Sequence, residues 1–230
     1  MAQFTRMNHL GPLIGTAAYL AYPKQLRINP TVLHYFSIAH NTALAVFSGW
    51  TFVSLLAFLM EKGLVIQPGY YFQDSRFDTI IWYFYLSKYY EYMDTFLVYL
   101  KGREPIFLQT FHHVGAVFIW HLFYVCPGDV IWMATLANSF IHTIMYSYYL
   151  GTLLKINAVK ILKQYVTSMQ LLQFLITMPS AIYLYYPKED SAGRTIIIIF
   201  AIYVLSLIGL FGKFYYETYI RKNRMLDSKA

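Results

Sequence analysis

Seven apolar segments constrain the fold of this chain more than any other feature. A membrane-spanning helix needs about 20 mostly apolar residues. Six segments meet that length, at residues 32–60, 79–100, 106–125, 129–150, 164–186 and 195–219. A seventh, at residues 10–22, is short and contains Gly11, Pro12 and Gly15, so its length also suits a re-entrant segment. The pattern predicts an all-α integral membrane protein with seven transmembrane helices, forming a single polytopic domain over residues 1–230.

Composition supports this class and excludes others. Apolar residues make up 58% of the chain and charged residues only 13%, about half the usual charged share of a globular domain. A soluble fold of this size could not bury so much apolar surface, and disorder, collagen and coiled coil are excluded by the same figures. Basic residues are dispersed between the apolar segments, so nucleic acid is not an expected partner. The lone cysteine, Cys126, allows no disulfide within the chain.

The distribution of Lys and Arg predicts the orientation in the membrane. Outside the seven segments, eleven of them lie on the side that holds the C-terminus and five on the opposite side. Cytosolic loops carry the excess of Lys and Arg in membrane proteins. The C-terminus is therefore expected in the cytosol and the N-terminus in the lumen or outside. The first apolar segment lacks a convincing cleavage site, so no cleavable signal peptide is expected.

Polar side chains recur within the apolar segments, where each one is costly and hence a functional candidate. In chain order they include Asn41, Lys88, Glu91, Asp94, Thr95, Gln109, His112, His113, Asn138, His142, Gln170 and Gln173. A helix rises about 1.5 Å per residue, and alternating helix directions then place these groups at one level, in the cytosolic half of the membrane. Helical spacing also puts Gln109, His112 and His113 on one face. The sequence therefore predicts a polar layer formed by several helices.

Three histidines in this layer point to chemistry rather than packing. A neutral imidazole can act as a base, a nucleophile or a metal ligand. Cys126 lies at a different depth, and no serine has a nucleophile-elbow sequence, so His112, His113 and His142 are the candidate reactive groups. Their neighbours Lys88 and Glu91 also suit a structural ion pair, and that interpretation stays open.

Other polar residues of the layer also have structural readings. Asp94 and Thr95 suit polar packing between helices, and the same holds for Gln170 and Gln173. Tyr146 and Tyr149 suit the wall of a cavity more than a catalytic role, and His40 suits a hydrogen-bonded packing residue. The sequence alone does not decide between these roles.

Four motifs together resemble the very-long-chain fatty acid elongases, the ELO family of 3-oxoacyl-CoA synthases. KYYEYMDT at 88–95 resembles KxxExxDT, QTFHH at 109–113 the histidine box, NSFIHTIMYSYY at 138–149 NxxxHxxMYxYY, and TSMQLLQF at 167–174 TxxQxxQF. HN at 40–41 is similar to the family's YN. Most animal members read HxxHH, whereas Gln109 at the first box position resembles members from algae and other protists, several of which act on polyunsaturated substrates.

The resemblance implies a reaction and an architecture. The reaction condenses a long-chain acyl-CoA with malonyl-CoA to give 3-oxoacyl-CoA, CO₂ and CoA, with no cofactor besides these substrates and no metal. The architecture is an inverted barrel of six helices around an acyl tunnel, with the first helix outside. The resemblance further implies the endoplasmic reticulum membrane, contact with membrane lipid and with other enzymes of the elongation cycle, and it is compatible with a homodimer.

The resemblance also implies roles for individual residues. His112 would be acylated as the nucleophile, His142 would contact the thioester or enolate, and His113 would orient or stabilise. Substrate-binding roles would fall to Gln109, Asn138, Lys88, Glu91, Asp94, Thr95, Tyr146, Tyr149, Gln170, Gln173 and Asn41. The alternatives are a histidine-metal membrane lipid hydrolase or desaturase and a non-enzymatic seven-helix receptor or transporter.

Overall fold

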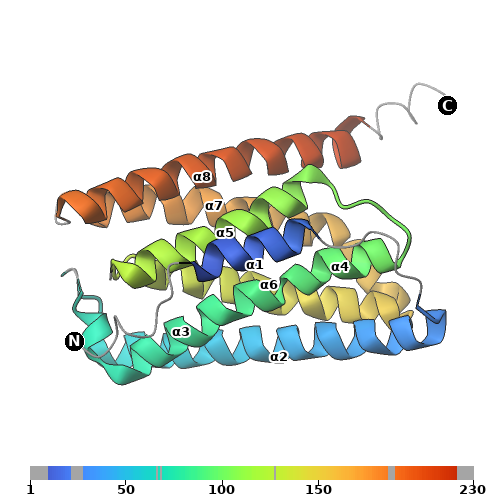
Figure 1. The fold of residues 1–230 in the computed structure, drawn as a ribbon, viewed down its shortest axis with the longest axis horizontal. Helices are drawn as coiled ribbons and strands as arrows, with labels where there is room; N and C mark the ends of the chain where they lie inside the picture. The colour runs from blue at the N-terminus through green and yellow to red at the C-terminus, as the bar shows by residue number, and fades with distance from the viewer. Residues whose placement is uncertain are drawn as a thin grey trace.

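A computed structural model describes residues 10–21, 28–65, 67, 69–126, 128–185 and 190–221. Every regular element within these ranges is helical, which confirms the all-α class. The long helices run along the long axis of the molecule (Figure 1). The basic C-terminal tail, 222–230, and the segment with Lys24 and Arg27 lie outside the described residues, so the predicted orientation stays a prediction.

The helices follow the apolar segments of the sequence. They are α1 (Gly11–Leu20), α2 (Pro30–Lys62), α3 (Ser75–Tyr90), α4 (Tyr92–Leu100), α5 (Phe107–Val125), α6 (Ile131–Leu153), α7 (Leu162–Tyr185) and α8 (Ser191–Tyr215). Short elements accompany them: the 3₁₀ helices η2 (Tyr71–Gln73) and η3 (Asn157–Ile161), and the π-helical turn η4 (Tyr216–Arg221). α2 and the α8–η4 segment, Ser191–Arg221, are long and apolar enough, by length and composition, to cross a membrane.

Capping side chains explain where several helices begin. The side chain of Asn29 accepts a hydrogen bond from the Thr31 N–H, and Pro30 occupies the first turn of α2. Asp74 caps α3 in the same way through the Arg76 N–H, at 2.9 Å. Such caps satisfy N–H groups that have no partner within the helix.

α2 distributes its side chains in the manner of a membrane protein. It buries polar side chains and exposes aliphatic ones. The buried polar residues are Ser37, His40, Asn41, Ser48 and Thr51, and the exposed aliphatic residues include Val32, Val46, Val53 and Met60. Polar groups that face other helices, and apolar groups that face outward, are what a lipid environment favours.

Pairwise packing joins six helical units into a closed ring. α2 packs on α6, α6 on α7, α7 on α8, α8 on α5, α5 on α3, and α3 returns to α2. α1 lies outside this ring, against α4 and α5 (Figure 1). The polar residues on the inner faces of different helices therefore point toward a common interior.

The predicted span over residues 79–100 is divided at Glu91 into two consecutive helices, α3 and α4. The Glu91 N–H still bonds the Ser87 carbonyl at 2.8 Å, but the Asp94 N–H bonds the Glu91 carbonyl, which is a tighter turn of the helix. The buried side chain of Glu91 is held by Lys88 at the same place. The break brings Glu91 and Asp94 to the cavity described next.

Candidate active site

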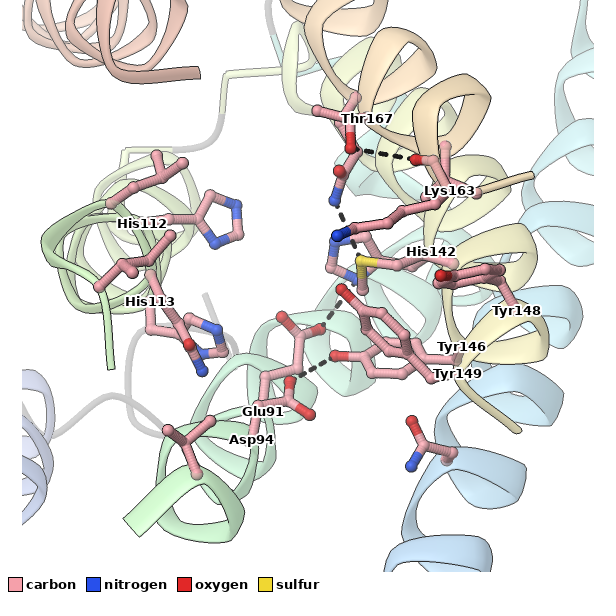
Figure 2. Close-up of a pocket in the computed structure, with 18 of the residues that line it drawn as sticks. Glu91, Asp94, His112, His113, His142, Tyr146, Tyr148, Tyr149, Lys163 and Thr167 are labelled. Atoms are coloured by element: carbon pink, nitrogen blue, oxygen red, sulfur yellow. Dashed lines mark hydrogen bonds and ion pairs between the residues drawn. The ribbon is translucent and has the colours of Figure 1, made fainter. Parts of the chain in front are cut away.

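A cavity of about 490 Å³ opens inside the ring of helices, and most of the predicted polar layer lines it. All the predicted site residues except Lys88, Thr95 and Asn138 contribute to its wall. Figure 2 shows His112 and His113 on one side of the cavity and His142, Tyr146 and Tyr149 on the other, with Glu91 and Asp94 between them. The predicted convergence of polar side chains from separate helices is therefore present in the structure.

The three histidines lie close together at the inner part of this cavity. The ring centroid of His112 lies 5.5 Å from that of His113 and 6.4 Å from that of His142. His113 and His142 are buried, while His112 is half-buried. α5 supplies the first two as neighbours in sequence, and α6 supplies the third from across the cavity.

Lys88 lies behind the cavity wall and links Glu91 to Asn138, which contacts His142. Its ammonium is almost fully buried and donates to Oε1 of Glu91 at 2.7 Å and to Oδ1 of Asn138 at 2.9 Å. It also lies 4.0 Å from the centroid of the Phe84 ring, at cation–π distance. Both the structural ion pair expected for Lys88 and Glu91 and their position beside the site are thus present.

These bonds fix the proton arrangement of His142. Because Lys88 donates to Oδ1 of Asn138, the amide nitrogen of Asn138 faces Nε2 of His142, at 3.1 Å. An amide N–H donates only, so Nε2 accepts and the ring hydrogen resides on Nδ1. That Nδ1 lies 3.5 Å from Oε1 of Glu91. This Nδ1 is buried and has no hydrogen-bond partner among the described residues, so Glu91 lies beside it at a longer distance.

Asp94 accepts two short hydrogen bonds from different helices. Nε2 of His40 lies 2.8 Å from Oδ1, and the Tyr146 hydroxyl donates to Oδ2 at 2.7 Å. The Tyr146 ring in turn contacts His142 edge-on, with 5.5 Å between centroids. His40 is hydrogen-bonded, as expected. Its partner is Asp94, a carboxylate of the cavity wall, and the sequence did not indicate this pairing.

Gln109 is held through a short chain of hydroxyls. Its amide nitrogen donates to Oγ1 of Thr95 at 3.1 Å, and the Thr95 hydroxyl shares a 2.8 Å hydrogen bond with the Tyr19 hydroxyl of α1. Tyr19 also stacks on Tyr92 with ring centroids 4.1 Å apart. Thr95 therefore acts behind the cavity wall, and α1 is tied to the site through it.

The two glutamines of α7 behave differently. The amide of Gln170 donates to the sulfur of Met145 at 3.0 Å. Gln173 is buried, and its Oε1 has no hydrogen-bond partner among the residues that the structure describes. Gln173 also lines a second, smaller cavity of about 30 Å³ that shares His112 and Phe174 with the first. An unsatisfied buried acceptor at such a junction is costly unless a ligand donates to it.

Three basic side chains line an outer part of the large cavity. They are Lys101, Arg103 and Lys163, all of them exposed. Desolvation lowers the pKa of Lys101, and the positive charge of Arg103 lowers it further. An anion bound at this end would relieve that repulsion. Below, Lys101, Arg103 and Lys163 are called the basic rim.

Comparison with known proteins supports the same assignment that the motifs suggest. A family model described as "ELO: GNS1/SUR4 family" matches residues 12–226. The chain belongs to the ELO family.

ELO relatives named as fatty acid elongases cover most of the chain. "Fatty acid elongase sre1" of Dictyostelium discoideum is 36% identical over 204 residues, which are 84% of this chain and 75% of the relative. "Very long chain fatty acid elongase 5" of Xenopus tropicalis is 32% identical and covers 94% of this chain and 77% of the relative. No solved structure matches the chain. The ELO assignment places this membrane protein in fatty acid elongation.

Within this ELO chain, sequence reasoning missed two features of the site. One is His40, whose partner Asp94 lies on another helix; the only signal was a second polar residue beside Asn41 in an apolar segment. The other is Tyr203 of α8, whose hydroxyl donates to the His112 carbonyl at 2.9 Å. No sequence motif marks Tyr203. Cys126 lies at the end of α5 and lines neither cavity, as its predicted depth implied.

Proposed function

We propose that this chain is a 3-oxoacyl-CoA synthase, an acyltransferase that condenses a long-chain acyl-CoA with malonyl-CoA. The products are 3-oxoacyl-CoA, CO₂ and CoA. The observation that carries the proposal is the cavity that joins the basic rim to three converging imidazoles. A cation-lined entrance suits the phosphates of CoA, and the imidazoles lie where the thioester of a bound acyl-CoA would reach.

The first half of the reaction transfers the acyl group to His112. The imidazole nitrogen attacks the thioester carbonyl, the C–S bond breaks, and the CoA thiolate leaves with the imidazole proton. An acyl-imidazole is a reactive acyl donor, so one difficult transfer becomes two easier ones. His112 suits this role because it lines both cavities, at the junction between the rim end and the apolar end.

The second half joins the acyl group to malonyl-CoA. Loss of CO₂ leaves an enolate, whose carbon attacks the acyl carbonyl. The C–N bond to His112 breaks, and the imidazole takes up one proton from the solution, the proton that the overall reaction consumes. The developing charge needs nearby donors. The rings of His142 and His113 both contact the ring of His112, and these two residues are the candidate donors. Glu91, through Nδ1 of His142, would hold that ring in place during the step.

The unsatisfied Oε1 of Gln173 supports a ligand at the junction of the cavities. Buried acceptors without donors are rare in folded proteins, and functional sites are where they persist. Gln173 lies where a bound acyl-CoA would pass from the large cavity into the small one. An amide N–H of a bound CoA arm would satisfy this oxygen.

The same proposal extends to the architecture and its location. We take the ring of α2, α6, α7, α8, α5 and α3–α4 as an inverted barrel, with the two cavities as parts of one acyl tunnel. The basic rim would face the cytosol in the endoplasmic reticulum membrane, where acyl-CoA and malonyl-CoA arrive. Long-chain substrates, including polyunsaturated ones, would extend away from the rim.

Turnover of labelled substrates tests the proposal. Membranes that contain the full chain are incubated with radiolabelled malonyl-CoA and a panel of acyl-CoA thioesters. Release of CO₂ together with a 3-oxoacyl product two carbons longer is expected. No CO₂ release and no longer product would instead favour a receptor or carrier. Stoichiometric iron or zinc in the purified protein would favour a metal-dependent hydrolase or desaturase.

A further inference from the structure

The small cavity beyond His112 is the part of the molecule where an acyl tail would be measured. It lies between α5, α6, α7 and α8, and its wall beyond the shared residues is largely apolar, including Trp120, Phe200, Val204 and Leu207. Its volume of about 30 Å³ holds only one or two water molecules, so an acyl tail enters only as side chains of its wall move. This region is called the tail compartment below.

Tyr203 joins α8 to the backbone of the proposed nucleophile. Its hydroxyl donates to the His112 carbonyl at 2.9 Å, and its ring packs on Phe111 with 5.7 Å between centroids. Tyr203 also lines the tail compartment. One side chain thus contacts the backbone of the proposed nucleophile and borders the route of the tail.

Gly115 allows Tyr203 to occupy this position. It lies on α5, about one turn beyond His112. A Cβ atom at residue 115 would lie 2.0 Å from Cε2 of Tyr203 and 2.7 Å from Cζ, far inside van der Waals contact. Only a hydrogen atom at this position leaves room for the ring, so the packing of α8 on α5 here depends on glycine.

We propose that Tyr203, seated against Gly115, is a specificity-determining residue that sets the width of the passage from His112 into the tail compartment. The inference rests on the proposed condensation and adds to it the selection of acyl chains by length and bend. An added Cβ at residue 115 drives the ring back by about 1.4 Å, from 2.0 Å to ordinary contact at 3.4 Å, and narrows the passage. A smaller side chain at residue 203 widens it.

A double-mutant cycle on the full chain tests the pair. Gly115→Ala, Tyr203→Leu, the double variant and the wild type are compared by kcat/KM for saturated acyl-CoA thioesters of increasing length and for a polyunsaturated one. Gly115→Ala is expected to lower the ratio for the longest over the shortest acyl chain about tenfold or more, the size of effect that one extra methylene has in a tight pocket. Tyr203→Leu is expected to raise that ratio.

The cycle also identifies the route of the effect. If the alanine acts by displacing the Tyr203 ring, it has nothing to displace in the Tyr203→Leu background, and the double variant matches Tyr203→Leu within about twofold. Tyr203→Phe keeps the ring and loses only the hydrogen bond, so its length ratio stays that of the wild type. If Gly115→Ala alone does not fold, Tyr203→Leu and Tyr203→Phe still decide by their ratios.

A matched control separates the effect of position from the effect of replacing glycine by alanine in a helix. Gly209→Ala on α8 makes the same change where a Cβ meets no atom of the described residues within 4 Å, and it leaves the length ratio unchanged. The proposal is overturned if Gly115→Ala and Tyr203→Leu change kcat/KM by one common factor for every acyl chain, or if the alanine retains its full effect without the Tyr203 ring. A wild-type chain with no condensation would reject the proposed function, and this inference with it; wild-type turnover with an unmoved ratio rejects this inference alone.

Discussion

Oε1 of Glu91 lies 3.5 Å from Nδ1 of His142, and the same oxygen accepts a hydrogen bond from the Lys88 ammonium at 2.7 Å. One carboxylate oxygen thus serves both a buried ion pair and a ring of the site. Lys88 also donates to Asn138, whose amide nitrogen faces Nε2, the other ring nitrogen of His142. Lys88 and Asn138 together orient His142 at the cavity wall, with Glu91 beside its Nδ1.

The buried pair Lys88–Glu91 predicts different outcomes for single and double replacements. Lys88→Met leaves the Glu91 carboxylate buried without its cation and is expected to cost about 3–5 kcal/mol of unfolding free energy. The double variant Lys88→Met/Glu91→Gln removes both charges and regains most of that stability, but not activity, since His142 loses its partners. Thermal unfolding in detergent and kcat measure the two effects. A double variant with wild-type kcat would contradict the positioning role.

Asp94 predicts a non-additive pair of losses. Tyr146→Phe or His40→Phe removes one of the two donors to Asp94 and leaves the other. Each single variant is therefore expected to lose at most about 1.5–3 kcal/mol of unfolding free energy. The double variant leaves the carboxylate without either donor and is expected to lose more than the sum. Tyr183→Phe, at an exposed position on α7, is the matched control and should have no effect. Additive losses would show that the two bonds act independently.

The basic rim predicts an effect on substrate binding rather than on chemistry. Lys101→Met or Lys163→Met removes one cation from the outer end of the cavity, which is worth about 1 kcal/mol near solvent. The KM for acyl-CoA should rise about fivefold at low salt with kcat little changed, and the difference should shrink as salt is added. Lys62→Met is the control, because Lys62 pairs with Asp74, away from the cavity. Equal KM values for wild type and both rim variants would show that CoA does not bind at this end of the cavity.

Asp74 predicts a pH-dependent contribution to stability. Hydrogen bonds from the Arg76 guanidinium, and then from the Arg76 N–H, hold the pKa of Asp74 well below its usual range. The ionised carboxylate therefore stabilises the fold above the unfolded-state pKa of about 3.9, and this stabilisation is lost as the pH falls through the lower folded-state pKa. Asp74→Asn keeps a capping oxygen for α3 but loses the charge.

The measurement for Asp74 is the Tm of wild type and Asp74→Asn across pH. The variant should melt lower at pH 7, and the gap should close as the pH drops below about 4. A gap that stays constant with pH would show that the side chain acts through its shape alone.

Much of the fold and of the site composition was predictable from the sequence, and the reasons are local. Apolar segments of helical length define the helices, and helix rise and facing predict that His112 and His142 meet at one level. The interruption at Glu91 was not predictable, because it accompanies a carboxylate that is held inside the fold. The contacts of His40 with Asp94 and of Tyr203 with the His112 carbonyl join residues far apart in sequence, and no periodicity encodes which side chains pair across a cavity.

The proposed mechanism requires that His112 carries the acyl group. The direct test incubates the purified chain with an acyl-CoA in the absence of malonyl-CoA and locates the adduct by mass spectrometry of its peptides. An acyl adduct is expected on His112. It should be missing in His112→Ala, present in Cys126→Ala, and discharged when malonyl-CoA is added. An adduct on Cys126, or condensation that continues in His112→Ala, would contradict it.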